Sequence, residues 1–229
     1  MYSGGSTPTE GTTTVRYTAP QAAEALQDLL RRADGSAPNI SRDDIKTLAA
    51  ANLLTNRSTT SIPRFDAADI KHLGTSVRYV GHSEICGIAA AGLVYKVSVL
   101  PRPRAFHEDG SWGWEPNPVV GVNGRLLRDH MGVDYSENPL SRTALGGFEG
   151  VWPISAKNAD ALAQNRGLLL ASCKGYVGPA KIRTVVDHLP IDGSTRRYLV
   201  TQPVPTEVEG FLGQGLWING KGGPISTFL

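Results

Sequence analysis

The stretch TNRSTTSIPRFDAADIKHL, Thr55–Leu73, decides the fold of the first part of the chain. A polar run rich in hydroxyl side chains ends in Ile62-Pro63-Arg64-Phe65, and an aspartate then opens an amphipathic segment. We interpret residues 55–65 as a β-hairpin, followed by a short helix that Asp66 caps and Gly74 ends. The hairpin is either a wing that contacts DNA or an ordinary connection, and the functional prediction depends on which of the two it is.

Two helices are predicted before this hairpin. In YTAPQAAEALQDLLRRA, residues 17–33, apolar side chains recur at helical spacing behind a Thr18 cap. In SRDDIKTLAAANLL, residues 41–54, Ser41 is the predicted cap. Asp43 and Asp44 fall in the first turn, where the helix dipole favours anions. The predicted order of elements up to residue 76 is therefore helix, helix, hairpin, helix.

Beyond residue 76 the composition shifts toward Gly, Pro, Val and Trp, and helical periodicity mostly disappears. Strands are predicted on both sides of a tight segment in residues 77–101, in the apolar run from residue 168 to 190, and in RRYLVTQPV. One helix, capped by Ser155, is predicted to end near Gly167. The sequence thus predicts an α+β fold with three parts: a disordered tail over residues 1–16, a small winged-helix-like domain over 17–76, and a larger β-rich, barrel-like domain over 77–229. The alternative is one α+β domain in which the first helices pack on the sheet.

The composition excludes some classes of function but does not identify a single one. The chain has 229 residues, is 40% hydrophobic and carries a formal net charge of +2, so no global basic field demands a nucleic-acid partner. No apolar run has the length of a membrane span, and the first residues do not form a secretory signal. Two cysteines fit a reducing compartment, with one bridge between them left open. We therefore expect a cytoplasmic protein without membrane contact and without a cofactor.

Three pieces of the first domain carry a family resemblance: Tyr17-Thr18-Ala19-Pro20 with Ala22-Ala23, then Leu53-Leu54, then IPRFDAADIKHL. Over residues 17–74 these pieces resemble the winged helix-turn-helix domain of the MerR and phage-excisionase type. In that family the second helix enters the major groove of double-stranded DNA, and the wing follows the neighbouring phosphates or the minor groove. The resemblance implies that Ser41, Arg42 and Lys46 lie near the groove. Short polar groups and guanidinium groups suit phosphate contacts, which predicts a DNA-binding role in the wing for Asn56, Arg57, Ser58, Thr59 and Arg64.

The balanced charge of the first domain is also compatible with a protein that binds no DNA. Residues 1–76 contain eight basic and eight acidic side chains, so this unit offers DNA little excess positive charge. If the second helix is the reading helix, Asp43 and Asp44 would face phosphates. A three-helix unit with this balance also suits a protein-interaction, dimerisation or inhibitor module that binds no nucleic acid.

The last third of the chain carries a second resemblance. Over residues 147–225 the chain is similar in layout to the small PUA-like β-barrels. The similarity rests on three pieces in order: GGFEGVWPIS, GLLLASCKGYVGPAKIRTVVDHLP and GFLGQGLWINGKGGPI. That resemblance implies recognition of a nucleobase or a nucleic-acid loop, which combines cations with aromatic faces. The candidate base-stacking or ligand residues, including two tryptophans from the loop FHEDGSWGWEP, are Trp112, Trp114, Trp152, Tyr176, Arg183, Arg196 and Arg197. The alternative is that the aromatic rings fill the barrel and the cations form a solvated face.

No catalytic set emerges from the sequence. HSEIC, residues 82–86, contains the His-x-Glu half of the zinc-deaminase signature, but the Pro-Cys-x-x-Cys half is missing and no metal site is predicted. The favoured function is a DNA-binding regulator of the phage or plasmid repressor type rather than an enzyme, and a homodimer because half-site reading uses two-fold symmetry. The alternatives are a modified-base or RNA reader or processing enzyme acting through the C-terminal domain, and an interaction module.

Overall fold

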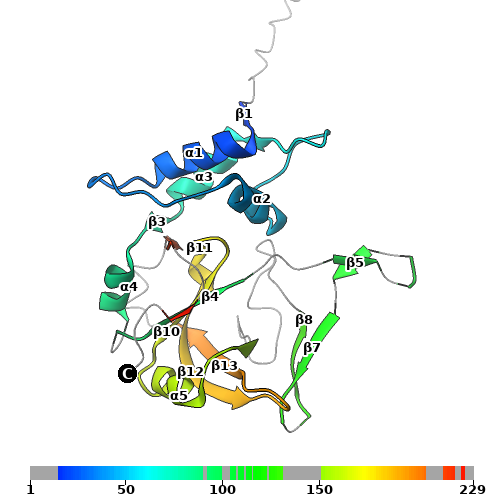
Figure 1. The fold of residues 1–229 in the computed structure, drawn as a ribbon, viewed down its shortest axis with the longest axis vertical. Helices are drawn as coiled ribbons and strands as arrows, with labels where there is room; N and C mark the ends of the chain where they lie inside the picture. The colour runs from blue at the N-terminus through cyan, green and yellow to red at the C-terminus, as the bar shows by residue number, and fades with distance from the viewer. Residues whose placement is uncertain are drawn as a thin grey trace, which may run out of the picture.

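The protein has a mixed α+β fold. The computed structural model describes residues 15–89, 92–99, 104–106, 108–110, 112–114, 116–122, 124–130, 151–204, 214–219 and 223–224. Within these ranges five α-helices occur: α1 (Ala19–Leu29), α2 (Arg42–Ala50), α3 (Ala67–Thr75), α4 (His82–Ile88) and α5 (Ala156–Gln164). None of these helices is long and apolar enough to cross a membrane. Figure 1 shows α1, α2 and α3 gathered on one side of the molecule, with the strands of the β-rich part on the other.

The predicted caps of the first two helices are confirmed. Thr18 is the N-cap of α1, and both its backbone N–H and its hydroxyl donate to Gln21 Oε1 at 2.9 Å. Ser41 is the N-cap of α2, and its hydroxyl oxygen accepts from the Asp44 N–H at 3.2 Å. These bonds satisfy N–H groups that a helix start leaves without partners. The helices then bury their apolar faces, and α1 packs against both α2 and α3.

A short pair of strands ties the start of the chain to the end of the predicted hairpin. β1 (Arg16–Tyr17) pairs antiparallel with β2 (Phe65–Asp66), and Tyr17 lies opposite Phe65. The hairpin itself closes through an isolated bridge between Asn56 and Phe65 and a 2.8 Å bond from the Arg57 N–H to the Arg64 carbonyl. Residues 57–64 therefore form a loop held at its base by backbone bonds, with the Phe65 side chain buried beneath it.

Gly74 does not end α3 as the sequence predicts, because the helix continues to Thr75 and Ser76 caps it. The glycine serves helix packing instead. A Cβ atom added at Gly74 would lie 2.8 Å from both Cβ and Cδ1 of Leu29 and 3.2 Å from Leu26 Cδ1. The missing side chain thus lets α3 approach α1 more closely than any other residue would allow.

The main sheet has six strands in the order β15-β4-β10-β12-β13-β9. β4 pairs parallel with β10, and the other neighbours pair antiparallel. The strands are β4 (Val94–Ser98), β9 (Val151–Trp152), β10 (Leu168–Ser172), β12 (Ile182–Pro190), β13 (Arg197–Pro203) and β15 (Gly223–Pro224). The helix α5, whose Ser155 cap accepts from the Asn158 N–H at 3.2 Å, packs against β12. The strands predicted in residues 168–190 and in RRYLVTQPV are confirmed.

Smaller sheets complete the β-rich part. A three-stranded sheet has the order β11-β14-β3, in which β14 runs parallel to β3. Two hairpins, β5–β6 and β7–β8, extend to one side in Figure 1. The bounds are β3 (Arg78–Tyr79), β5 (Arg104–Phe106), β6 (Trp112–Trp114), β7 (Pro116–Val120), β8 (Leu126–His130), β11 (Tyr176–Val177) and β14 (Leu216–Trp217). The tight segment predicted between β3 and β4 contains the helix α4.

One hydrophobic cluster joins the helices to the sheet. It contains Leu26 and Leu48 of the helical layer together with Val97, Leu169 and Trp217 of the β-rich part. A second cluster around Val80 and Ile85 packs α4 against the other face of β10. The predicted boundary near residue 76 stays a prediction, and buried apolar contact continues across it. We refer to residues 15–76 as the helical part and to the remainder as the β-rich part.

Candidate functional site

The loop between α2 and α3 is held in shape by Asn56. Its side-chain Oδ1 accepts from the Ser58 N–H at 3.1 Å and from the Arg64 N–H at 3.2 Å, so one amide oxygen links both arms of the loop. The Ser58 hydroxyl oxygen in turn accepts from the Thr60 N–H at 3.0 Å. Asn56 thus shapes the loop, while the Thr59 side chain at its tip is exposed.

The two loop arginines have different surroundings. Arg57 Nε lies 3.2 Å from Asp66 Oδ2, and Arg16 Nε lies 3.4 Å from the other oxygen of the same carboxylate. The Asp66 side chain is only 15% exposed, so the two guanidinium groups cover it. Arg64 is exposed and forms no ion pair with any residue that the structure describes. The base of the loop therefore carries more exposed positive than negative charge.

The exposed face of α2 presents two cations around one carboxylate. Asp43 Oδ1 lies 3.3 Å from Lys46 Nζ and 3.8 Å from Arg42 Nε. All three side chains are at least half exposed, so these contacts are weak and readily exchanged. Arg42 and Lys46 can therefore turn toward a new anionic partner at little cost.

Asp44 is directed into the molecule, away from this face. Its Oδ2 accepts from the backbone N–H and the hydroxyl of Ser41 at 2.9 and 2.8 Å. Its Oδ1 lies 3.3 Å from Lys174 Nζ, which belongs to the turn between β10 and β11. The β-rich part thus neutralises one of the two acids at the start of α2. This contact is the feature of the site that sequence reasoning missed, because no local pattern connects residue 44 with residue 174.

The candidate stacking residues do not form one surface. Tyr176 and Arg183 are buried, and Arg183 Nε donates to the Thr201 hydroxyl at 3.2 Å. Trp152 is half-buried on the edge strand β9, where Arg197 lies opposite it on β13. The neighbouring Arg196 is exposed. The backbone of Trp112 and Trp114 forms β6, but their side chains lie outside the described part of the structure.

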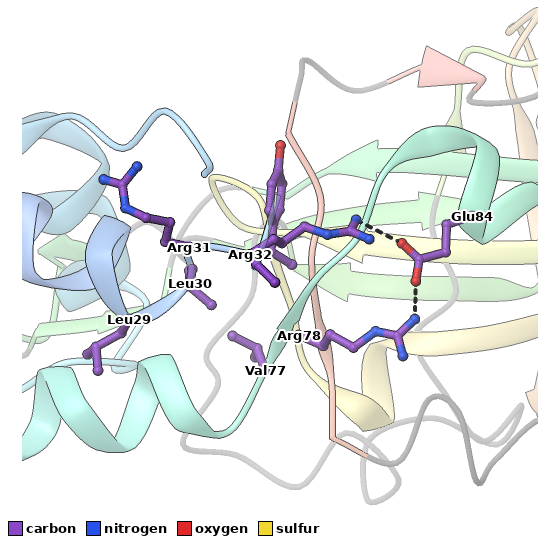
Figure 2. Close-up of a pocket in the computed structure, with 9 residues that line it drawn as sticks. Leu29, Leu30, Arg31, Arg32, Val77, Arg78 and Glu84 are labelled. Atoms are coloured by element: carbon purple, nitrogen blue, oxygen red, sulfur yellow. Dashed lines mark hydrogen bonds and ion pairs between the residues drawn. The ribbon is translucent and has the colours of Figure 1, made fainter. Parts of the chain in front are cut away.

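A pocket of about 400 Å³ opens where the helical part meets the β-rich part. The end of α1, with Leu29, Leu30 and the three residues that follow, forms one wall; Val77, Arg78, Tyr79 and Glu84 form the other. Figure 2 shows the guanidinium groups of Arg32 and Arg78 directed at the two oxygens of Glu84. Arg32 Nη1 donates to Glu84 Oε2 at 3.1 Å, and Arg78 Nη2 donates to Oε1. Arg32, Arg78 and Glu84 come from three segments of the chain, and no sequence motif predicts that they meet.

A buried lysine lies behind the same region. The Lys96 side chain is 1% exposed and its Nζ donates to the Asn219 carbonyl at 3.0 Å. His82 Nε2 lies 3.1 Å from the same carbonyl oxygen, and the Asn219 side-chain amide donates to the Tyr79 hydroxyl at 3.0 Å. Burial lowers the pKa of Lys96 to about 8. These bonds attach the segment after β14 to β4 and α4.

His82 and Glu84 of the HSEIC motif contact other groups of the protein. Glu84 bonds to two arginines, His82 lies at a backbone carbonyl, and the described residues hold no group of three metal-binding side chains. Cys86 and Cys173 are both free thiols, which answers the question of a bridge. Burial raises the pKa of the Cys173 thiol to about 12.

Comparison of the chain with protein-family models, with curated proteins and with solved structures finds no match. The function must therefore be inferred from the residues and geometry of this chain.

Proposed function

We propose that the protein binds double-stranded DNA through its helical part, with α2 in the groove and the loop 57–64 as the wing. The observation that carries this proposal is the disposition of charge on α2 and the loop. Arg42 and Lys46 are exposed on α2, and Arg64 is exposed on the loop. Asp44, which would repel phosphates, is held by Lys174 of the β-rich part.

The backbone layout supports the same proposal. Helix, helix, loop and helix follow one another, and β1 pairs with the strand that leaves the loop. This pairing fixes the direction of the loop relative to the start of α1. In Figure 1, α2 lies on the side of α1 and α3 that faces the β-rich part, and the loop extends to the right of the helical layer. The proposal assigns groove contacts to α2 and phosphate contacts to the loop.

The proposed role is regulatory, with the β-rich part stabilising the helical part and supporting a homodimer. Two-fold symmetric operators are read by two copies of one domain, one per half-site. The other partner class that the sequence leaves open is a single-stranded or RNA ligand on the β-rich part. The specific observation in its favour is the cross-strand neighbourhood of Trp152 and Arg197, since stacking and cation contacts cooperate in such sites.

The test is fluorescence anisotropy of the full chain with labelled duplex DNA of mixed sequence, single-stranded DNA and RNA, over a series of salt concentrations. We expect duplex affinity to fall steeply with salt, and Arg64→Ala to reduce the slope of log K against log salt by about 1. Lys157→Ala, which removes an exposed cation from α5, is the matched control and should leave the slope unchanged.

Three results would count against DNA binding by α2 and the loop. If Arg64→Ala and Lys157→Ala shift the slope equally, the loop makes no phosphate contact. If only single strands or RNA bind, and Trp152→Ala removes that binding, the function lies in the β-rich part. Absence of any salt-dependent affinity would favour a protein-interaction module.

A further inference from the structure

The geometry of the pocket between α1 and α4 points to a binding site for a small molecule that carries a phosphate group. The central observation is the convergence of Arg32 and Arg78 on one carboxylate. Each guanidinium group donates to a different oxygen of Glu84, so both groups are directed at a single carboxylate. We infer that Glu84 occupies the place of the ligand's anionic group and gives way when the ligand enters.

The chemistry of the arginines favours phosphate over carboxylate. A guanidinium group presents several N–H donors in a planar fork, and it binds phosphate through two parallel hydrogen bonds. Glu84 offers two oxygens, and each of them accepts from one of the two guanidinium groups. A phosphate monoester offers three terminal oxygens and more negative charge than a carboxylate, so it attracts two guanidinium groups more strongly.

Displacement of Glu84 costs little free energy, because the side chains involved are exposed to solvent. The Arg32, Arg78 and Glu84 side chains are 40%, 43% and 30% exposed. Ion pairs with this much solvent contact contribute little to stability. Asp34 lies 4.0 Å from Arg32 Nε, and Arg32 contacts Glu84 through the outer nitrogen Nη1, which a ligand would take over. The cluster is therefore better suited to exchange of anions than to holding the fold together.

The volume and walls of the pocket suit a ligand larger than the phosphate alone. About 400 Å³ is within the range of small-molecule sites. Leu30 and Val77 are buried apolar residues at the pocket, and the Leu29 side chain is partly exposed there. The body of a small molecule can fill the pocket beside the exposed Leu29 side chain while its phosphate reaches the two arginines. Arg31 does not take part, because its guanidinium group is directed away from Glu84 and bonds to Asp28 at 2.9 Å.

This site is distinct from the proposed DNA-contacting surface, and its test does not depend on DNA. Inorganic phosphate, pyrophosphate and acetate are titrated into the full-length protein by calorimetry at constant ionic strength. Glu84→Gln keeps the shape of the side chain but removes the competing charge. We expect this variant to bind phosphate and pyrophosphate roughly tenfold more tightly than the wild type, because a charge-assisted hydrogen bond is worth about one decade of affinity.

Removal of either arginine has the opposite expected effect. Arg78→Met should weaken binding of both phosphates roughly tenfold or more, and Arg32→Met provides the second variant if the first does not fold. Lys157→Met is the control for a lost surface charge and should bind as the wild type does. Three results would overturn the inference: affinity unchanged in Glu84→Gln, affinity unchanged in a folded Arg32 or Arg78 variant, or acetate binding as tightly as phosphate.

Discussion

Lys174 Nζ lies 3.3 Å from Asp44 Oδ1, and this ion pair joins the turn between β10 and β11 to the first turn of α2. Lys174 occupies a left-handed backbone conformation with φ 52, and Gly175 follows with φ 98. The tight turn thereby directs the lysine toward the helical part. The β-rich part thus contributes one cation next to the start of α2.

The coupling between these two residues can be measured directly. A double-mutant cycle of Lys174→Gln and Asp44→Asn should give a coupling free energy of about 0–1 kcal/mol, because the side chains are 41% and 20% exposed. Chemical denaturation of the four proteins provides the measurement. A coupling that falls as salt is added would identify the ion pair as its source, whereas a coupling well above this range would mean that the contact also holds the turn in place.

Asp43→Asn should strengthen duplex DNA binding. Asp43 is the exposed carboxylate between Arg42 and Lys46, and its removal releases both cations and abolishes a repulsive charge. We expect a severalfold gain in affinity at low salt, measured by anisotropy. The matched variant is Asp160→Asn, which removes a half-exposed carboxylate from α5. An equal gain in both variants would indicate a change in net charge only and would contradict a specific role for α2.

Two helical glycines should respond in opposite ways to alanine. Gly74→Ala places a Cβ 2.8 Å from Leu29 Cβ, which cannot rotate away, so we expect a loss of about 1–3 kcal/mol in the free energy of unfolding. Gly87 in α4 has no atom within 4 Å of such a Cβ, and Gly87→Ala should stabilise the protein by up to about 1 kcal/mol. Urea denaturation of both variants checks the pair. A tolerated Gly74→Ala would show that α1 and α3 can separate without cost.

The buried ammonium of Lys96 predicts a particular pH dependence. Its pKa is lowered to about 8 from 10.5, so between these values the unfolded chain binds more protons than the folded one. Stability from this group therefore rises with pH across that window, by about 3 kcal/mol in total, and is constant below it.

Comparison with Lys96→Met isolates this contribution, because other groups titrate alike in both proteins. The difference in unfolding free energy, wild type minus variant, should stay level from pH 6 to 7.5 and rise from pH 8 to 10. Urea denaturation at each pH provides the values. A level difference throughout would mean that the folded protein leaves the amine with its ordinary pKa.

The two thiols should react in a fixed order. Cys173 is fully buried and its pKa is raised to about 12, while Cys86 is half-buried with a smaller rise, also caused by burial. Because the thiolate is the reactive form, iodoacetamide should modify Cys86 first and Cys173 only on unfolding. Mass spectrometry of the wild type and of Cys86→Ser distinguishes the sites. Rapid labelling of Cys173 in native Cys86→Ser would contradict the packing around β10.

The local parts of this fold are readable from the sequence, and the non-local parts are not. Thr18, Ser41 and Ser155 identify three helix starts because a cap acts within three residues of its own position. The sequence predicts a helix end at Gly74, but the reason for a glycine at this position is the close packing against Leu29 of α1. The pairings of β1 with β2 and of β3 with β14 depend on residues far apart in the chain.

The same distinction applies to the sites. The exposed cations of α2 and the loop follow from helix periodicity and turn composition, and the structure places them as exposed. The pocket needs Arg32, Arg78 and Glu84 to meet, and the meeting depends on how α1 packs beside β3 and α4. Burial of Tyr176 and Arg183 likewise follows from the sheet order rather than from their own sequence context.

The pairing of β14 with β3 also has a consequence for the order of events during synthesis. Asn219 and Tyr79, which bond across this region, are 140 residues apart in the chain. While the ribosome is still translating the last segment, β3 has no parallel neighbour, and Lys96 has no carbonyl from residues 218 and 219. The helical part can form early from local contacts, but the sheet beneath it closes only after the C-terminal strands emerge. A nascent chain stalled before residue 214 should therefore remain a target for chaperones.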